Sequence, residues 1–223
     1  GHMGFVLLGI ATMTPTGVNG ALFANIAHGL ITGLLFFLVG AIKDRYGTAD
    51  LDTLAGATGA ALYGRAPRLG ALLAFAAVAS LGLPGLAGFW GEMLTLFGAY
   101  SPAEGLSRPA FRTFMAIGAF GTLLTAAYML IVVRRVCMGE HTPHSQFSPD
   151  DRTPQPADDP ERSMTAGSPQ LPRSTPRLAD IQGYEAAAWT PLAALTVLAG
   201  LWPAVLLGLT DPAVQKLLAG GKS

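Results

Sequence analysis

The sequence predicts an all-α fold, a polytopic bundle of transmembrane helices in which proline and glycine break one helix. Charged residues make up only 13% of the 223 residues, hydrophobic residues make up 51%, and the mean hydropathy is +0.43. Residues 138–180 hold 11 of the 28 charged residues and 8 of the 16 prolines. The remaining charges are too few to cover the surface of a soluble globule, so we expect an integral membrane protein in contact with the lipid bilayer.

The composition also excludes several classes of protein. With 14 Lys and Arg against 14 Asp and Glu, the net charge is zero, so we expect no nucleic-acid partner. The one cysteine, Cys137, excludes a disulfide framework and any site built from several cysteines. We therefore expect no metal, no redox centre and no cofactor bound by this chain. No signal-peptide pattern opens the sequence, although Gly1-His2-Met3 is also what a cleaved expression tag leaves.

Uncharged runs and turn signals predict the elements in order. Residues 1–42 contain no Asp, Glu, Lys or Arg, and Thr14-Pro15-Thr16-Gly17 divides them. Residues 1–13 are shorter than the roughly 20 residues of a membrane span and are expected to be the end of a truncated helix. The other expected elements are transmembrane helices at 18–42, 113–135 and 186–210, a broken transmembrane helix at 69–100 and a Pro-rich, partly disordered cytoplasmic loop at 138–180.

The distribution of basic residues predicts the orientation in the membrane. The loops at 43–68 and 134–184 carry ten of the fourteen Lys and Arg residues. Basic loops stay in the cytoplasm, so we expect these two there and the C-terminus on the extracytoplasmic side.

The predicted break lies in the second uncharged run, at Gly82, Pro84 and Gly85. Proline between glycines interrupts the helical hydrogen bonds, and inside a membrane such a break persists only beside protein or a water-filled cavity. Broken helices of this kind mark ion pathways in transporters.

Glu92 is the most informative residue because it is the only charged residue between 69 and 103. An ionisable side chain inside a span is costly and usually functional, and a buried carboxyl group suits reversible proton carriage. The alternative is that Glu92 lies at the membrane interface, where it would only reach toward water or cap a helix.

The span at 18–42 carries a polar stripe near its middle. Asn25, His28 and Thr32 share one helix face, where they could relay protons, or where a neutral histidine could join helices by hydrogen bonds. Gly29 and Gly33 predict close packing against another helix. In the span at 113–135, a mildly polar face predicts hydrogen bonds to backbone or to other helices; its members are Thr122, Thr125 and Tyr128.

Several segments together resemble one known family, the antiporter-like subunits of respiratory complex I and the large subunits of Mrp-type cation/proton antiporters. The matching segments are 2–9 (HMGFVLLG), 27–30 (AHGL), 35–40 (LFFLVG), 80–85 (SLGLPG), 88–92 (GFWGE), 128–130 (YML), 189–192 (WTPL) and 200–203 (GLWP). Asp44-Arg45, Arg134-Arg135-Val136, Asp180 and Glu185 also fit the family pattern. Glu92 stands where other members carry lysine, which points to the M-type subunits of NADH–quinone oxidoreductase.

The resemblance implies the second part of an inverted-repeat, antiporter-like fold. It also implies a subunit that contributes to proton translocation coupled to electron transfer from NADH to quinone, in a bacterial inner (plasma) membrane. Glu92 would then be the terminal proton-exchange residue, and His28 and His2 would belong to a hydrated polar axis. The implied partners are other membrane-arm subunits of complex I and the missing N-terminal half of the same subunit. A Mrp-type antiporter subunit and a structural fragment that translocates nothing remain alternatives.

Overall fold

The computed structural model describes residues 1–47, 62, 66–138 and 180–220, and every regular element in these ranges is a helix, which confirms the all-α fold class. The helices are α1 (His2–Ala11), α2 (Pro15–Tyr46), α5 (Pro67–Ala79), α6 (Ala87–Tyr100), α7 (Arg108–Val132), α8 (Gly183–Leu201) and α9 (Pro203–Gly220). A π-helical segment, Val133–Met138, extends α7. The expected Pro-rich loop at 138–180 lies outside the described residues except for its first and last residue.

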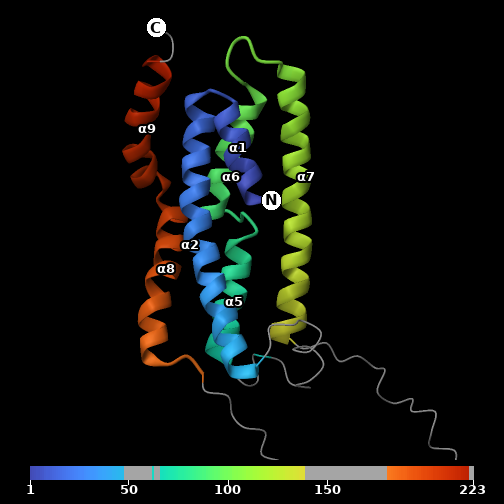
Figure 1. The fold of residues 1–223 in the computed structure, drawn as a ribbon, viewed down its shortest axis with the longest axis vertical. Coiled ribbons are helices and arrows are strands. Elements are labelled where there is room, and N and C mark those ends of the chain that lie inside the picture. Colours follow the sequence, from blue (N-terminus) through green and yellow to red (C-terminus); the bar gives the residue numbers. More distant parts are fainter. Residues whose placement is uncertain (48–61, 63–65, 139–179, 221–223) are drawn as a thin grey trace, which may run out of the picture.

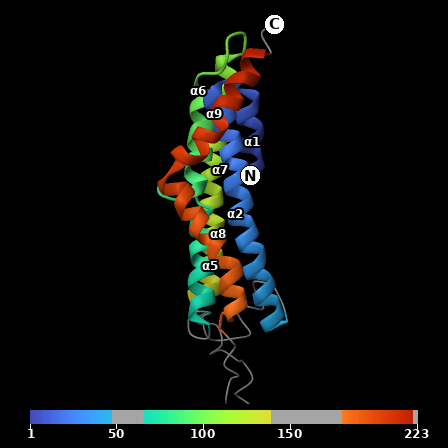
Figure 2. The ribbon, with the colours of Figure 1, turned by 90° about the vertical axis from the view of Figure 1, so that its left-hand side faces the viewer.

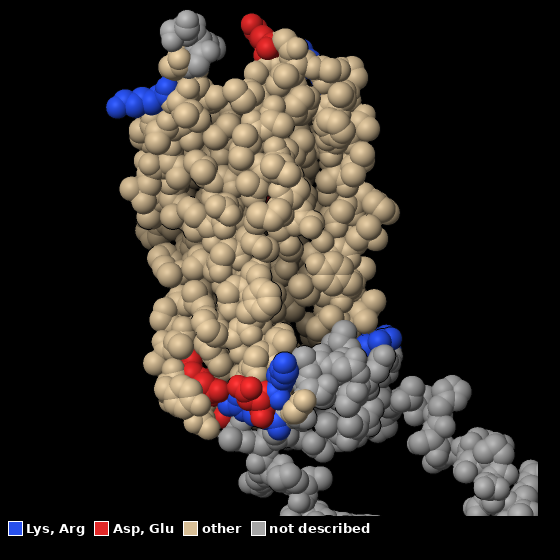
Figure 3. All heavy atoms as spheres, viewed as in Figure 1, with Lys and Arg blue, Asp and Glu red and all other residues tan. Residues whose placement is uncertain are grey.

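The helices form an elongated bundle that suits a membrane (Figure 1). By length and composition, α2 and α7 are each long and apolar enough to cross a bilayer, and α8 with α9 forms a third candidate bent by 76°. On the face shown in Figure 3, the charged side chains gather at the two ends of the long axis and leave an uncharged belt between them. The chain is therefore a membrane protein.

Helix α2 is the central element, and local chemistry fixes both of its ends. Its first turn is capped by Thr14, whose Oγ1 accepts a hydrogen bond from the Gly17 amide at 3.1 Å, and Pro15 occupies the first helical position. Its last turn closes at Gly47, which takes the left-handed conformation with φ 74°. Between these ends α2 contacts α1, α5, α6, α8 and α9, so it sets their relative positions.

Helices α5 and α6 stand end to end along α2, and residues 80–86 form the break between them (Figures 1 and 2). Gly82 and Gly85 both have positive φ, at 66° and 94°, which a residue with a Cβ atom rarely adopts. The structure thus has a helix break at the Gly82, Pro84 and Gly85 positions singled out from the sequence.

The last predicted span divides at Trp202. Helix α8 passes through Pro191 without ending, whereas Pro203 starts α9, which continues past residue 210 to Gly220. Proline lacks an N–H group and is well tolerated at the first position of a helix, which accounts for the new start at Pro203.

Helices α2 and α6 pack closely against each other, and this packing depends on glycine. A Cβ atom on Gly91 would lie 2.5 Å from Ala24 Cα, and one on Gly20 would lie 2.6 Å from the Thr95 backbone nitrogen. By contrast, nothing lies within 4 Å of a Cβ atom built on Gly29 or Gly33. The close packing predicted for Gly29 and Gly33 is therefore wrong within the described part of the chain, because these glycines lie on a face of α2 that no other described helix approaches.

Polar side chains join the helices at both ends of the bundle. At one end, Arg45 of α2 pairs with Glu185 of α8 at 2.7 Å, and the Asp180 carboxylate accepts hydrogen bonds from the Arg68 and Leu69 amides in the first turn of α5. Toward the opposite end, Asn19 of α2 donates to Asp211 of α9 at 2.8 Å and accepts from Thr210, also at 2.8 Å.

Replacing Asn19 with alanine is expected to lower the free energy of unfolding by about 1–3 kcal/mol, because the buried amide satisfies two polar side chains of α9. Asn25→Ala, at an exposed position of the same helix, is the matched control and should change it by about 0.5 kcal/mol or less. Denaturant titration of the purified chain in detergent micelles measures both values. Equal losses in the two variants would contradict the role given to Asn19.

Candidate functional site

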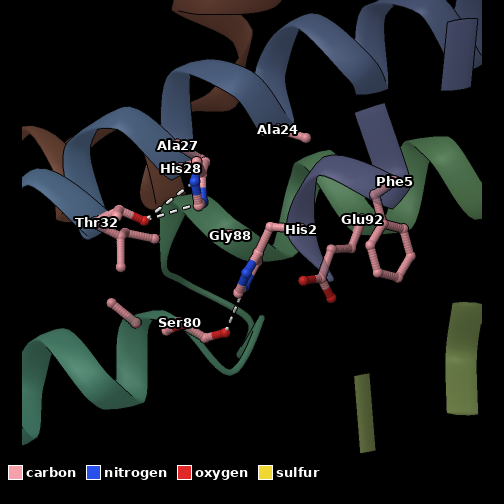
Figure 4. Close-up of a pocket in the computed structure, with 11 residues that line it drawn as sticks. His2, Phe5, Ala24, Ala27, His28, Thr32, Ser80, Gly88 and Glu92 are labelled. Carbon is pink, nitrogen blue, oxygen red and sulfur yellow. Dashed lines mark hydrogen bonds between the residues drawn. The ribbon is translucent and has the colours of Figure 1, made fainter. Parts of the chain in front are cut away.

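A small cavity lies beside the helix break, where α1, α2 and the broken helix meet (Figure 4). Its volume of about 20 Å³ gives room for about one water molecule, and it is too small for an organic substrate. It is lined by His2, Phe5, Ala24, Ala27, His28, Ile31, Thr32, Ala79, Ser80, Gly88 and Glu92. Three of these residues are titratable, and each comes from a different helix.

The two histidines form a pair across the cavity. The centroids of the His2 and His28 rings are 5.3 Å apart, and the rings are tilted by 31°. His2 Nε2 lies 3.3 Å from the Ser80 carbonyl oxygen, which can only accept, so this nitrogen carries the proton of the bond. His28 Nδ1 lies 3.0 Å from the Thr32 hydroxyl, which can donate or accept. Each ring is thus held by one partner.

Glu92 lies over the helix break. Its Oε2 accepts a hydrogen bond from the Thr122 hydroxyl of α7 at 3.3 Å. A Cβ atom on Gly82 would lie only 2.7 Å from the same oxygen. The positive φ of Gly82 favours glycine there, and a side chain at this position would displace the Glu92 carboxyl group.

A second, wider cleft opens on the other side of Glu92. It has a volume of about 370 Å³, lies between α1 and α7, and includes Phe5, Phe114 and Thr125 in its walls. His2, Phe5 and Glu92 line both this cleft and the small cavity. The two titratable side chains among them, His2 and Glu92, therefore border both spaces.

The structure brings together most of the residues chosen from the sequence. His2, His28, Thr32 and Glu92 line the small cavity, whereas Asn25 is exposed and is not among the lining residues. In the described ranges, no group of three or more His, Cys, Asp or Glu side chains gathers as a metal site would require.

Two further residues of the site had only weak sequence signals. Ser80 contributes its backbone carbonyl, which is free because α5 ends at Ala79, and a helix end always leaves such groups. Thr122 bonds both Glu92 and the Gly118 carbonyl oxygen, so the polar face predicted around it makes the interhelix and backbone bonds that were expected.

Comparisons with known proteins agree with this architecture. Residues 1–125 match the protein-family model described as "NADH:quinone oxidoreductase/Mrp antiporter, TM". NADH-quinone oxidoreductase subunit M of Rhodobacter capsulatus is 32% identical over 218 residues, which cover 97% of this chain and 34% of the relative. NAD(P)H-quinone oxidoreductase chain 4 1 of Synechococcus sp. (strain JA-3-3Ab) is 41% identical over 143 residues, which cover 64% of this chain and 26% of the relative.

A solved structure also matches, that of respiratory complex I from Thermus thermophilus with bound NADH. The superposition has a TM-score of 0.67 at 29% identity and covers 97% of this chain and 37% of that chain. The match thus spans between 26% and 37% of the length of these three proteins. Because the family model matches more than half of the residues, the chain belongs to the family of NADH:quinone oxidoreductase and Mrp antiporter transmembrane proteins.

Proposed function

We propose that the chain is part of a membrane-arm subunit of a proton-pumping NADH–quinone oxidoreductase, and that Glu92 exchanges protons with water reached through His28 and His2. One observation carries the proposal. Two histidines and a glutamate from three different helices line a single cavity of about 20 Å³, which has the size of a water site. The oxidation of NADH and the reduction of quinone would take place in other subunits.

The proposed proton path runs along the titratable side chains that line the cavity. An imidazole ring takes up a proton on one nitrogen and releases one from the other, so the paired rings of His2 and His28 suit a relay. Glu92 then takes the proton at its carboxylate, which the Thr122 hydroxyl holds in place. Release from Glu92 would occur toward the cleft between α1 and α7, whose wall includes the same carboxyl group.

The setting of this site is also part of the proposal. We place the chain in a bacterial plasma membrane with its C-terminus on the extracytoplasmic side, following the excess of Lys and Arg in the loops at 43–68 and 134–184. Its partners would be other membrane-arm subunits and the remaining length of the same subunit. The exposed apolar side chains of α7 offer a surface for such partners and for lipid; they include Phe114, Ile117, Phe120, Leu123 and Leu124.

The relatives named above favour this function over a Mrp-type cation/proton antiporter, because each is a component of a quinone oxidoreductase or its complex. Vesicles that contain the assembled protein separate the two functions. A pH change driven by a Na⁺ gradient alone, without NADH, would favour the antiporter.

Glu92→Gln tests the proposal in the assembled complex. The amide cannot carry a proton, so proton translocation per NADH oxidised is expected to fall by about tenfold or more, while the complex still assembles. Inverted membrane vesicles give the ratio from proton uptake and NADH oxidation measured together. Glu104→Gln, at an exposed position outside the helices, is the control and should keep the wild-type ratio. A normal ratio in the Glu92→Gln complex would refute the role of Glu92.

A further inference from the structure

Two helix breaks of the chain lie against each other. The junction of α8 with α9 and the junction of α5 with α6 lie at the same level of the long axis in both views (Figures 1 and 2). The nearest neighbours of a Cβ atom on Gly200 would be the Gly85 carbonyl group and Leu86 Cα, at distances no side chain can occupy. The end of α8 therefore lies in direct backbone contact with the break beside Glu92.

One side chain bonds the two breaks to each other. Trp90 of α6 donates its indole N–H to the Gly200 carbonyl oxygen at 2.7 Å. Gly200 lies in the last turn of α8, where carbonyl groups have no partner further along their own helix. The Trp90 indole therefore gives the Gly200 carbonyl oxygen a hydrogen-bond donor that α8, which ends at the bend, does not provide.

Trp90 packs against a hydrophobic cluster that residues on both sides of that bend also contact. The buried members of this cluster are Phe23, Ala27, Ala87 and Ala199, and Leu206 and Leu207 pack against it as Trp90 does. Ala199 belongs to α8, and Leu206 and Leu207 belong to α9, so a change in the bend angle would shift the cluster on which the indole packs. Ala27 is the neighbour of His28 on α2.

The same short segment also touches Glu92. The break at 80–86 contacts the Glu92 carboxyl group at Gly82 and the end of α8 at Gly85. Trp90 and Glu92 are two residues apart on α6, so their side chains point to roughly opposite faces, one toward α8 and the other toward the cavity. A shift of α6 that follows the bend would move the carboxyl group against Gly82.

We propose that Trp90 is a positioning residue that connects the α8–α9 bend to the Glu92 carboxyl group. The bend angle of the last span then sets the position of this carboxyl group in the cavity wall. The proposal rests on the proton-exchange role proposed above for Glu92. Trp90 and Gly200, whose carbonyl group accepts the indole hydrogen bond, would act only by positioning α6, since neither residue lines the cavity.

Trp90→Phe in the assembled complex removes the N–H donor and keeps an aromatic ring. A hydrophobic carbodiimide reacts with protonated carboxyl groups, so its rate of reaction with Glu92, followed by mass spectrometry, reports the surroundings of that group directly. We expect this rate to change by about threefold or more, with fewer protons translocated per NADH. Trp189→Phe is the matched control, since Trp189 is a buried tryptophan of α8 whose hydrophobic cluster includes Leu69 and Leu73 of α5 and does not include Trp90. It should leave the labelling rate unchanged.

A double variant tests whether Trp90 acts through Glu92. In the Glu92→Gln background, Trp90→Phe should cause no further loss of proton translocation, because the group it positions is already gone. The same fractional loss in both backgrounds would overturn the proposal, as would wild-type labelling of Glu92 in Trp90→Phe.

The two proposals can fail separately. If Glu92→Gln pumps protons normally, the proposed function fails, yet the labelling rate in Trp90→Phe still decides whether the tryptophan positions the carboxyl group. If Glu92→Gln abolishes pumping and Trp90→Phe leaves both labelling and pumping unchanged, only the positioning role is wrong.

Discussion

Gly20→Ala is expected to lower the free energy of unfolding by about 2–3 kcal/mol, whereas Gly33→Ala on the same helix should leave it unchanged or raise it by up to about 1 kcal/mol. The added methyl group at position 20 would lie 2.6 Å from the Thr95 nitrogen and 2.9 Å from the Leu94 carbonyl carbon. These are backbone atoms of α6, so α2 and α6 must separate to make room. At position 33 no atom lies within 4 Å, and alanine favours a helix more than glycine does.

Denaturant titration of the purified chain in detergent micelles, followed by circular dichroism, measures both changes. Destabilisation of similar size in the two variants would contradict the close α2–α6 contact. The substitution at position 20 should also reduce proton translocation, because α2 carries His28 and α6 carries Glu92, and separating the helices moves these side chains apart. Gly33→Ala serves as the control for that measurement as well.

The helices themselves could be predicted because the membrane imposes a simple pattern on the sequence. Uncharged runs bounded by Lys, Arg and turn residues located α2 and α7 to within a few residues. The position of the bend in the last span could not be predicted in the same way. Pro191 and Pro203 both remove one backbone donor, and only packing decides which of them ends a helix.

The candidate site could be predicted only in part. The spacing of residues shows which side chains share a helix face, but it does not show which other helices contact that face. Glu92 and His28 were evident as polar residues inside apolar runs. Asn25 shares a sequence stripe with His28 and Thr32. Ala24 lies in the cavity wall, so Asn25, the next residue, points about 100° away around the helix, toward the outside. The contact of His2 with Ser80 joins residues 78 positions apart, which no local pattern can indicate.

Glu185→Ala is expected to lower the free energy of unfolding by about 3 kcal/mol or more, because it removes the carboxylate from a nearly buried ion pair. The side chains of Arg45 and Glu185 are each only 11% exposed, and their closest atoms are 2.7 Å apart. The same Glu185 oxygen accepts a hydrogen bond from the Gln182 amide at 2.8 Å, which closes the first turn of α8. Asp44→Ala, next to Arg45 and exposed, is the control and should change stability by about 0.5 kcal/mol or less.

The double variant Arg45→Met/Glu185→Leu distinguishes a pair interaction from two separate roles. If the cost of Glu185→Leu comes mainly from leaving the guanidinium without its carboxylate, the double variant should be more stable than the sum of the single losses by about 1–3 kcal/mol. Arg45 also donates to the Ala41 carbonyl oxygen at 3.1 Å, and Glu185 caps α8, so full recovery is not expected. Losses that simply add would mean that the contact between α2 and α8 does not depend on this ion pair, and that Glu185 stabilises the fold as a helix cap alone.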